Sequence, residues 1–387
     1  MRKLFSIMFS AVLLLIVSAQ WTWAQKVKFY DLGHYPGGTW AELHGINDSG
    51  VAVGSGDVAG DKRMIGVPLF GPNAGNWFES GVSSSVVDEL LPVISNTGMI
   101  AGAITGDNGN SEAYAWMPNH GGFHLGTLPG GYRSYAYGIN HRGTFIVGQS
   151  FQKLQEAPFI IGTAVVWTPR VNWTGGRPTL AWEIHALPTD GLEKPGAVFE
   201  GVTLRLWDGW GVNDSGQIAG EAYEYNADKD EWWEIGVVWN PIKNGRQWEM
   251  QRLPMAADFP YTEPLAINNL GEIVGDVWGS AAAPALWKKD SRKGKTWELT
   301  VLPTLNPTPM WDIAWGINDF GDIVGTCYDP DWVPQATRWN THHLSSAKLL
   351  GFPGDWSVAY GVNNLGIAVG GYGIGDGPEQ AAAVAIH

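Results

Sequence analysis

The sequence predicts an all-β protein: a seven-bladed β-propeller of four-stranded blades. Three observations lead to this prediction: a short motif recurs along the chain, each copy has the pattern of a hairpin, and the composition favours short strands. The first copy, HGINDSGVAVGS, occupies residues 44–55, and six further copies follow it. The copies are spaced by about 45 to 73 residues, which is typical of propeller or solenoid repeats.

Each copy is predicted to form a β-hairpin. A polar four-residue stretch that ends in glycine, such as Asn213-Asp214-Ser215-Gly216, separates two apolar runs. Asparagine favours the turn because its side chain can bond the backbone two residues on, and glycine accepts a positive φ. The asparagines are Asn47, Asn140, Asn213, Asn268, Asn318 and Asn363, with Ser95 in the second copy. The third copy carries one extra residue, Thr144 or Phe145, which we interpret as a bulge.

Length and composition agree with this fold class. The chain has 387 residues, of which 44% are hydrophobic, so it can bury a large core. Only 16% of residues are charged, and 52 glycines and 23 prolines favour many short strands joined by tight turns. A single cysteine, Cys327, excludes an internal disulfide framework and a cysteine metal cluster. A formal net charge of −14 would repel a polyanion, so nucleic acid is not an expected partner.

Residues 1–24 have the pattern of a secretory signal peptide. Arg2 and Lys3 precede an apolar run from Leu4 to Val17, and small residues follow at Ala19 and Ala24. An uncleaved membrane anchor is the alternative, but the run is short for a bilayer. We therefore expect residues 25–387 to form a single propeller domain that is secreted, extracellular or periplasmic, monomeric, and without a membrane span after cleavage.

The remaining strands follow each hairpin in order. A third strand ends in an aromatic residue in most units: Phe70, Trp116, Trp167, Trp239, Trp287 and Trp339. A fourth, outer strand precedes the next hairpin, at 76–81, 122–131, 180–188, 248–254, 296–303 and 347–354. The last unit ends at its third strand, 380–387, whereas residues 26–33 form an unpaired strand near the start. We predict that this N-terminal strand completes the last blade, which closes the ring and removes exposed edges.

Four segments together resemble a known family: GINDSGVAVGS, EAYAW, HLGTLPGGYRSYAYGIN and YGINHRGTFIVGQS. Their order and turns are similar to those of the bacterial "probable extracellular repeat, HAF family", over nearly all of the mature chain. The resemblance implies an exported repeat protein but supplies no catalytic residues. The second copy, with Val93 and Ser95, and the enlarged fourth unit depart from the pattern.

Aromatic and acidic residues dominate the segments that would enter the central channel. An aromatic ring packs against the apolar face of a sugar while carboxylates and tyrosine hydroxyls bond its hydroxyl groups, so we expect a polysaccharide or other glycan as ligand. The expected binding residues are Trp40, Arg133, Tyr135, Arg205, Trp207, Trp210, Trp311, Asp312, Trp315 and Trp356. Packing between blades is the alternative role for these tryptophans, above all for Trp210 and Trp315.

A polysaccharide-degrading enzyme is the second hypothesis, and a protein-interaction scaffold is the third. A glycoside hydrolase would use His44 or the carboxylates Glu42, Asp208, Glu263 and Asp312 as acid and base. A lyase would instead hold a uronate with Arg133 and Arg205 while His44 and Tyr137 exchange protons. In either case Glu42, His44, Tyr137, Asp208 and Glu263 are expected on one arc of the channel mouth, because these positions vary most between the repeats.

No cofactor is expected, with calcium as the one alternative. The Asn-Asp-Ser-Gly turns and the sequence GDNGN at 106–110 faintly suggest calcium, but they lack the spaced acidic ligands of a calcium loop. Two insertions, 188–209 and 221–233, enlarge the fourth unit. Insertions on a repeat scaffold commonly carry function, and solvated loops of no consequence are the alternative.

Overall fold

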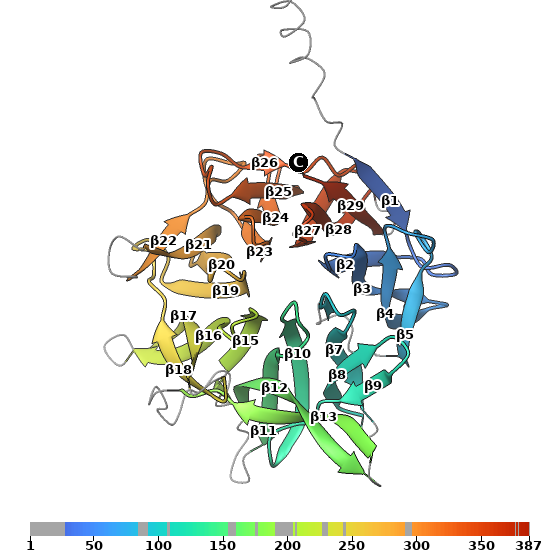
Figure 1. Ribbon diagram of the computed structural model, residues 1–387. Helices are drawn as coiled ribbons and strands as arrows, with labels where there is room; N and C mark the ends of the chain where they lie inside the picture. The colour runs from blue at the N-terminus through green and yellow to red at the C-terminus, as the bar shows by residue number, and fades with distance from the viewer. Residues whose placement is uncertain are drawn as a thin grey trace, which may run out of the picture.

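The computed structural model is a ring of seven antiparallel sheets around a central channel (Figure 1). It describes residues 28–83, 92–106, 109–153, 160–174, 177–189, 204–205, 207–226, 231–242, 245–290, 296–375, 377 and 379–386. The predicted signal peptide lies outside these residues. Within the described part of the chain, no helix is long and apolar enough to cross a membrane.

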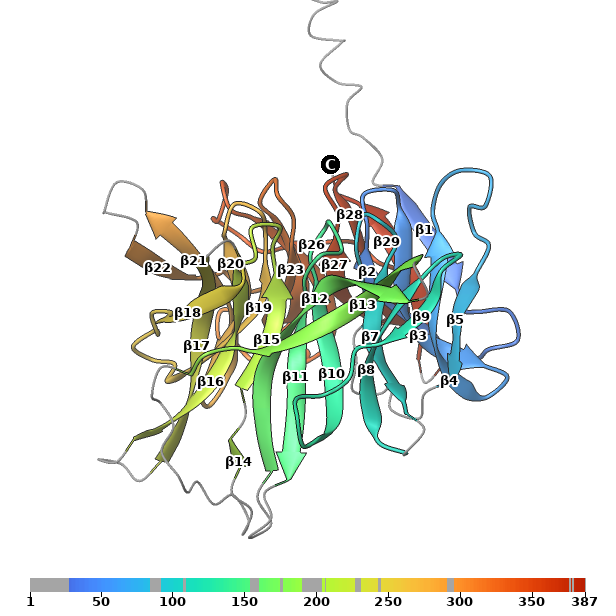
Figure 2. The same ribbon diagram turned by 60° about the horizontal axis from the view of Figure 1, so that its bottom comes forward.

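Each sheet is one blade, and its strands follow one another from the channel to the rim. Blade 1 contains β2 (Ala41–Ile46), β3 (Val51–Val58), β4 (Asp61–Pro68) and β5 (Phe78–Ser83). Blade 2 contains β6 (Val93–Ile94), β7 (Ile100–Thr105), β8 (Ser111–Met117) and β9 (Gly121–His124). Blade 3 contains β10 (Gly131–Ile139), β11 (Ile146–Lys153), β12 (Ile160–Thr174) and β13 (Arg177–Ala186), and the short β14 (Leu204–Arg205) pairs parallel with β12. Figure 2 shows β14 at the lower edge of the ring, below β12.

The other four blades repeat this arrangement. Blade 4 contains β15 (Trp207–Val212), β16 (Ile218–Asn226), β17 (Glu231–Ile242) and β18 (Gln247–Arg252). Blade 5 contains β19 (Tyr261–Ile267), β20 (Ile273–Trp278), β21 (Ala282–Asp290) and β22 (Thr296–Val301). Blade 6 contains β23 (Ile313–Ile317), β24 (Asp322–Tyr328), β25 (Pro334–Asn340) and β26 (Lys348–Leu349). Blade 7 contains β27 (Trp356–Val362), β28 (Ile367–Gly373), β29 (Gln380–Ala385) and, as its outer strand, β1 (Phe29–Gly33).

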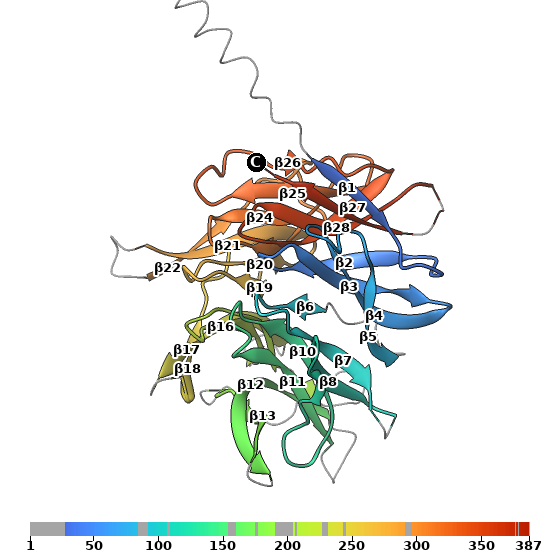
Figure 3. The same ribbon diagram turned by 45° about the vertical axis from the view of Figure 1, so that its right-hand side comes forward.

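The pairing of β1 with β29 closes the ring, as the sequence predicted. Phe29 lies opposite Val384 and Gly33 opposite Ala381 in an antiparallel ladder. The ring of Phe29 also packs edge-on against Phe352, with the centroids 6.2 Å apart. Figure 3 shows β1 running alongside the strands of blade 7, so both ends of the chain share one sheet.

The hairpin turns have the predicted chemistry. In blade 4 the side-chain oxygen of Asn213 accepts hydrogen bonds from the backbone N–H groups of Ser215 (3.1 Å) and Gln217 (3.0 Å), and Gly216 has a φ of 81°. The bulge interpretation of the third copy was wrong. The N–H groups of Thr144 and Phe145 both donate to Asn140 at 2.8 Å, so the extra residue enlarges the turn between β10 and β11.

The motif asparagines also join neighbouring blades. The side-chain N–H of Asn213 donates to the backbone carbonyl of Asn268 (3.1 Å), and Asn268 donates in turn to that of Asn318 (3.0 Å). The series continues from Asn318 to Asn363 (2.9 Å) and from Asn363 to Asn47 (2.9 Å), which crosses from the last blade to the first. We call the face of the ring that carries these turns the Asn-turn face, and the opposite face the loop face.

Tryptophans at the ends of the third strands form the core between blades. Trp167, Trp239 and Trp287 are completely buried and Trp339 is 3% exposed. The indole N–H of Trp239 donates to the carbonyl of Pro188 (2.8 Å), and Trp287 and Trp339 do the same with Pro254 and Pro303. The recurrent Leu-Pro pair at the end of an outer strand therefore anchors the next blade.

Candidate functional site

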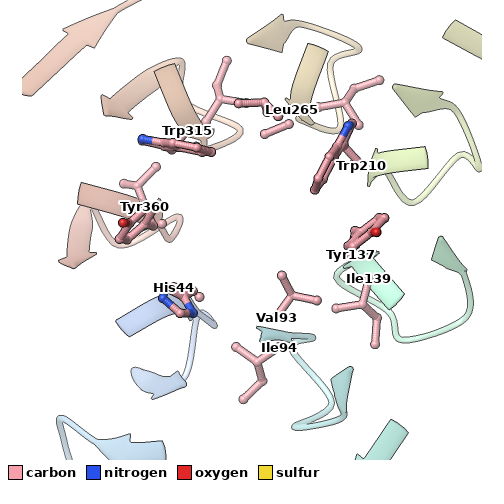
Figure 4. A pocket seen from close by; sticks show the side chains of 18 of the residues that line it. His44, Val93, Ile94, Tyr137, Ile139, Trp210, Leu265, Trp315 and Tyr360 are labelled. Carbon is pink, nitrogen blue, oxygen red and sulfur yellow. The ribbon is translucent and has the colours of Figure 1, made fainter. Parts of the chain in front are cut away.

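A β-bulge in the innermost strand directs one side chain per blade into the channel. In β10 the pairing register shifts between Ala136 and Gly138, which leaves Tyr137 without a partner in β11. The same shift occurs in the innermost strands of blades 1, 4, 5, 6 and 7. The bulged residues are His44, Tyr137, Trp210, Leu265, Trp315 and Tyr360, which we call the channel belt. A bulge re-aims a side chain without ending the strand, and Figure 4 shows these side chains around one open space.

Glycine follows five of the six belt residues, and Ala266 follows Leu265, because neighbouring innermost strands lie close together there. A Cβ atom on Gly138 would lie 2.2 Å from the carbonyl oxygen of Trp210, and one on Gly361 would lie 2.7 Å from that of His44. At these two positions the backbone of the neighbouring blade leaves no space for a Cβ atom, which accounts for the glycine of the GIN and GVN sequences there.

The belt has strong internal contacts on two sides of the channel. Tyr137 stacks on Trp210, with ring centroids 4.4 Å apart and an interplanar angle of 26°. Across the ring, Tyr360 contacts His44 edge-on at 5.1 Å and Trp315 at 5.4 Å. The space that the belt lines has a volume of about 200 Å³ and continues toward the isoleucines and valines of the motif.

The Asn-turn end of this space is covered by polar side chains. His141, from the blade 3 turn, reaches Asn269 (3.2 Å) and approaches the Asp319 carboxylate (3.7 Å). Asn364 bonds both Asp319 (3.1 Å) and Asp48 (3.2 Å) around the same ring. These contacts narrow the Asn-turn end of the space.

Glu42, His44, Tyr360 and Glu379 form one polar group between blades 1 and 7. Nε2 of His44 lies 3.1 Å from the Glu42 carboxylate. Burial would raise the pKa of Glu42, but the hydrogen bond and charge of His44, with hydrogen bonds from Tyr360 and Glu379, lower it below its usual value. Burial, together with the charge of Glu42, raises the pKa of Glu379 to about 9. At neutral pH the pair thus holds one ionised and one protonated carboxyl group.

Five carboxyl groups gather between blades 4 and 5: Asp208, Glu221, Glu234, Glu263 and Asp276, which we call the acidic cluster. Burial and neighbouring carboxyl charges raise the pKa values of Asp208 and Glu263 to about 7. Burial and the same kind of repulsion raise the pKa values of Glu221 and Asp276 well above the usual range. Tyr223 and Trp278 donate hydrogen bonds to Glu234 at 2.9 and 3.0 Å.

The structure divides the five predicted catalytic residues into two groups. Asp208 and Glu263 lie in the acidic cluster, and Tyr137 is close enough for Asp208 to raise its pKa, after the larger effect of burial. Glu42 and His44 belong to the group between blades 1 and 7. The predicted single arc is therefore two separate polar groups on the channel wall.

The predicted binding residues fall in several environments. Trp210 and Trp315 belong to the channel belt. The Arg133 guanidinium lies 4.0 Å from the ring centroid of Phe151 and 5.8 Å from that of Tyr135, which is itself buried. Arg205 lies in β14, beside blade 3, and its side chain is outside the described residues.

Five other predicted binding residues lie away from the belt. Trp207 is 4% exposed and packs in the core between blades 3 and 4, and Asp312 is completely buried, accepting backbone hydrogen bonds from Met310 and Tyr328. Trp311 is 52% exposed in the segment before β23. Trp40 precedes β2 and Trp356 begins β27; both are half-buried. Residues 190–203 and 227–230, from the two insertions, lie outside the described part of the chain.

Sequence reasoning missed three members of the acidic cluster: Glu221, Glu234 and Asp276. A signal for two of them was present. Glu221 and Asp276 occupy the position directly after the last motif glycine, where the other copies have Ser55, Ala103, Gln149, Thr326 and Gly371. Two acids at one repeat position in successive blades indicate a local concentration of carboxyl groups.

These features define the class of protein: a seven-bladed β-propeller with an aromatic belt in its channel. No protein-family model matches the sequence, and no curated protein sequence matches it. Among solved structures, the chain is similar to an acylaminoacyl peptidase of Pyrococcus horikoshii, with a TM-score of 0.52, 10% identity, and coverage of 88% of this chain and 50% of that one. At this identity the likeness supports the propeller fold alone.

Two further similarities have lower TM-scores. A streptogramin B lyase matches with a TM-score of 0.47 and 9% identity over 92% of this chain and 97% of that one. A Trypanosoma rangeli sialidase in complex with the inhibitor DANA matches with a TM-score of 0.45 and 15% identity over 82% of this chain and 57% of that one. The chain thus spans a little over half the length of the sialidase.

Proposed function

We propose that this protein is a secreted carbohydrate-binding propeller whose ligand enters the channel from the loop face and contacts the channel belt. The observation that carries the proposal is the belt itself. Six bulges present two tryptophans, two tyrosines, a histidine and a leucine to one space, in a fold whose other aromatic residues are largely used for packing. Sites for small ligands combine such apolar walls with a few placed polar groups.

Unpaired polar atoms in the belt support this proposal. Nε1 of Trp210 and Nδ1 of His44 are buried and have no hydrogen-bond partner among the described residues. Buried polar groups are normally paired, so these two atoms favour a ligand that can bond them. Trp210 offers a donor, and His44 offers an acceptor when its proton is on Nε2 toward Glu42. Hydroxyl groups of a sugar can satisfy both.

The size of the space favours a single sugar unit. Its volume of about 200 Å³ is below the 300–1,000 Å³ or so of pockets for drug-sized ligands. The Asn-turn end is also covered by His141 and its partners. We therefore expect the end of a glycan chain, or a side branch, to bind better than an internal segment.

Titration of the full mature chain with neutral and uronate-containing oligosaccharides tests the proposal. Trp315→Ala should weaken binding by at least about tenfold, which corresponds to about 1.4 kcal/mol. The matched control is Trp173→Ala, because Trp173 is 72% exposed at the end of β12. Binding to no glycan, or unchanged affinity of a folded Trp315→Ala variant, would refute the proposal.

Proton-transfer catalysis is a second candidate, favoured by the contrast between Glu42 and Glu379. Environments that push two carboxyl pKa values apart are typical of acid–base pairs. The two groups lie close enough to shift each other's pKa, an arrangement that suits proton exchange at one place, as in a lyase, better than two carboxyl groups on opposite sides of a glycosidic bond. An increase in ultraviolet absorbance from an unsaturated uronate would support it, whereas binding without such an increase would exclude it.

A further inference from the structure

The acidic cluster brings five carboxyl groups together and has no cationic partner among the residues that the structure describes. Asp208, Glu221, Glu234 and Asp276 are 7%, 6%, 7% and 3% exposed. Among the ion pairs of the described residues, none includes a member of this cluster. Burying a charge without a partner costs several kcal/mol, so this arrangement requires either protons or a cation.

The positions of the oxygen atoms agree with one bound cation. Carboxylate oxygens of Glu221, Glu234 and Glu263 all lie within 4.8 Å of one another. Two oxygens that bind the same Ca²⁺ at about 2.3–2.6 Å can be up to about 5 Å apart. The three side chains come from β16, β17 and β19, so their relative positions are fixed by strands and not by loops.

Unsatisfied oxygens beside this trio give an independent indication. Oδ1 of Asp208 and Oδ1 of Asp276 are buried and have no hydrogen-bond partner among the described residues. Asp208 and Glu221 lie close enough to shift each other's pKa, and the charges of Glu263 and Glu234 act on Asp276, so both aspartates lie beside the trio. Buried oxygens without a donor are the groups that a bound cation satisfies.

We propose that Glu221, Glu234 and Glu263 bind one divalent cation between blades 4 and 5, with Asp208 and Asp276 completing its oxygen shell. The donors are all carboxylate oxygens, which suits a hard cation, and their number suits Ca²⁺, which takes six to eight oxygens. The ion would join the enlarged fourth blade to the fifth. This site is separate from the turns and from residues 106–110, where the sequence suggested calcium, and it does not depend on glycan binding.

The test uses the full mature chain after treatment with a chelator, with Ca²⁺ alone as the probe. Calorimetric titration should give one site, and Ca²⁺ should raise the melting temperature, since a ligand that binds only the folded state stabilises it. Tb³⁺ in place of Ca²⁺ should show luminescence sensitised by Trp278, whose indole lies 3.0 Å from Glu234. Mg²⁺ should bind more weakly, because it requires a smaller octahedral site.

Glu221→Gln with Glu234→Gln should reduce Ca²⁺ affinity by at least tenfold and abolish the Tb³⁺ signal. The same double variant should melt no lower than the wild type without metal, because it removes two mutually repelling carboxyl groups. Glu379→Gln is the matched control: it replaces a half-buried carboxyl group elsewhere on the channel and should leave Ca²⁺ binding unchanged. Absence of Ca²⁺ binding by the wild type, or equal binding by the double variant, would overturn the proposal. The carboxyl groups of the acidic cluster would then be stabilised by protonation instead of by a cation.

Discussion

Replacing Asn363 by alanine tests the role of the asparagine ring in joining the blades. Asn363 is 3% exposed, and its side-chain N–H donates to the carbonyl of Asn47 (2.9 Å), across the junction between blades 7 and 1. Its side-chain oxygen accepts from the backbone N–H groups of Leu365 (3.1 Å) and Ile367 (2.9 Å). Three buried or half-buried hydrogen bonds are lost together.

The expected cost follows from these three bonds. Each contributes about 0.5–1.5 kcal/mol, and donors or acceptors left buried without partners cost more, so we expect a loss of about 3–4 kcal/mol. With an unfolding entropy of about 2.1 cal/mol/K per residue, a domain of roughly 360 residues loses about 1 °C for each 0.75 kcal/mol. The melting temperature should therefore fall by about 4–5 °C.

Thermal unfolding followed by circular dichroism and calorimetry measures this change. Asn73→Ala, in the exposed turn between β4 and β5, is the control and should have little effect. Asn363→Ser should be intermediate, because Ser95 in blade 2 already accepts the N–H of Met99 at 3.1 Å. If Asn363→Ala melts at the same temperature as the Asn73→Ala control, the hydrogen bonds between motif asparagines do not hold the blades together and the reasoning fails.

Three further changes test other parts of the structure. Gly138→Ala should destabilise the fold by several kcal/mol, because its Cβ would lie 2.2 Å from a backbone oxygen. Gly209→Ala should be tolerated, because its Cβ would come no closer than 3.4 Å to its neighbours. Equal melting temperatures of the two variants would contradict this reasoning. The pKa of Glu379 is about 9 in the folded protein against an ordinary value of 4.5, so the folded state binds this proton more tightly than the unfolded state. The contribution of Glu379 to the free energy of unfolding should therefore be full below about pH 4.5 and should be lost as the pH rises to 9. Glu379→Gln should flatten this dependence in denaturant titrations at pH 5, 7 and 9, and an unchanged slope would exclude the assignment. A mature chain that begins at His34 lacks β1 and should melt at a lower temperature than the full chain; an unchanged value would refute ring closure.

The fold could be predicted because its determinants are local and repeated. The asparagine and glycine of each turn determine a hairpin within a few residues, and the unpaired strand near residue 29 follows from counting strands in the last unit. The bonds from each asparagine to the next blade could not be predicted, because they depend on how blades tilt against one another. The presence of Ser95 at the asparagine position of the second copy also gave no indication of these bonds between blades.

The candidate site was predicted in part for a similar reason. The belt positions varied between repeats and so were recognised, but the bulge that points them into the channel depends on strand register, which the sequence pattern does not reveal. Glu234 lies on a third strand opposite Tyr223 of the same blade, but it reaches Trp278 only after blades 4 and 5 pack together. Tertiary packing, and not local pattern, assembles the acidic cluster.

The pairing of β1 with β29 determines the order in which this protein can fold. The other strands of each blade follow one another directly along the chain, so six blades can form as soon as their own residues are available. Phe29, by contrast, must remain without its partner until Val384 has been synthesised, and contacts between such distant residues form slowly. We therefore expect closure of blade 7 to be a late step of folding. A permuted chain in which β1 follows β29 directly would convert this step into the formation of a hairpin and would fold faster.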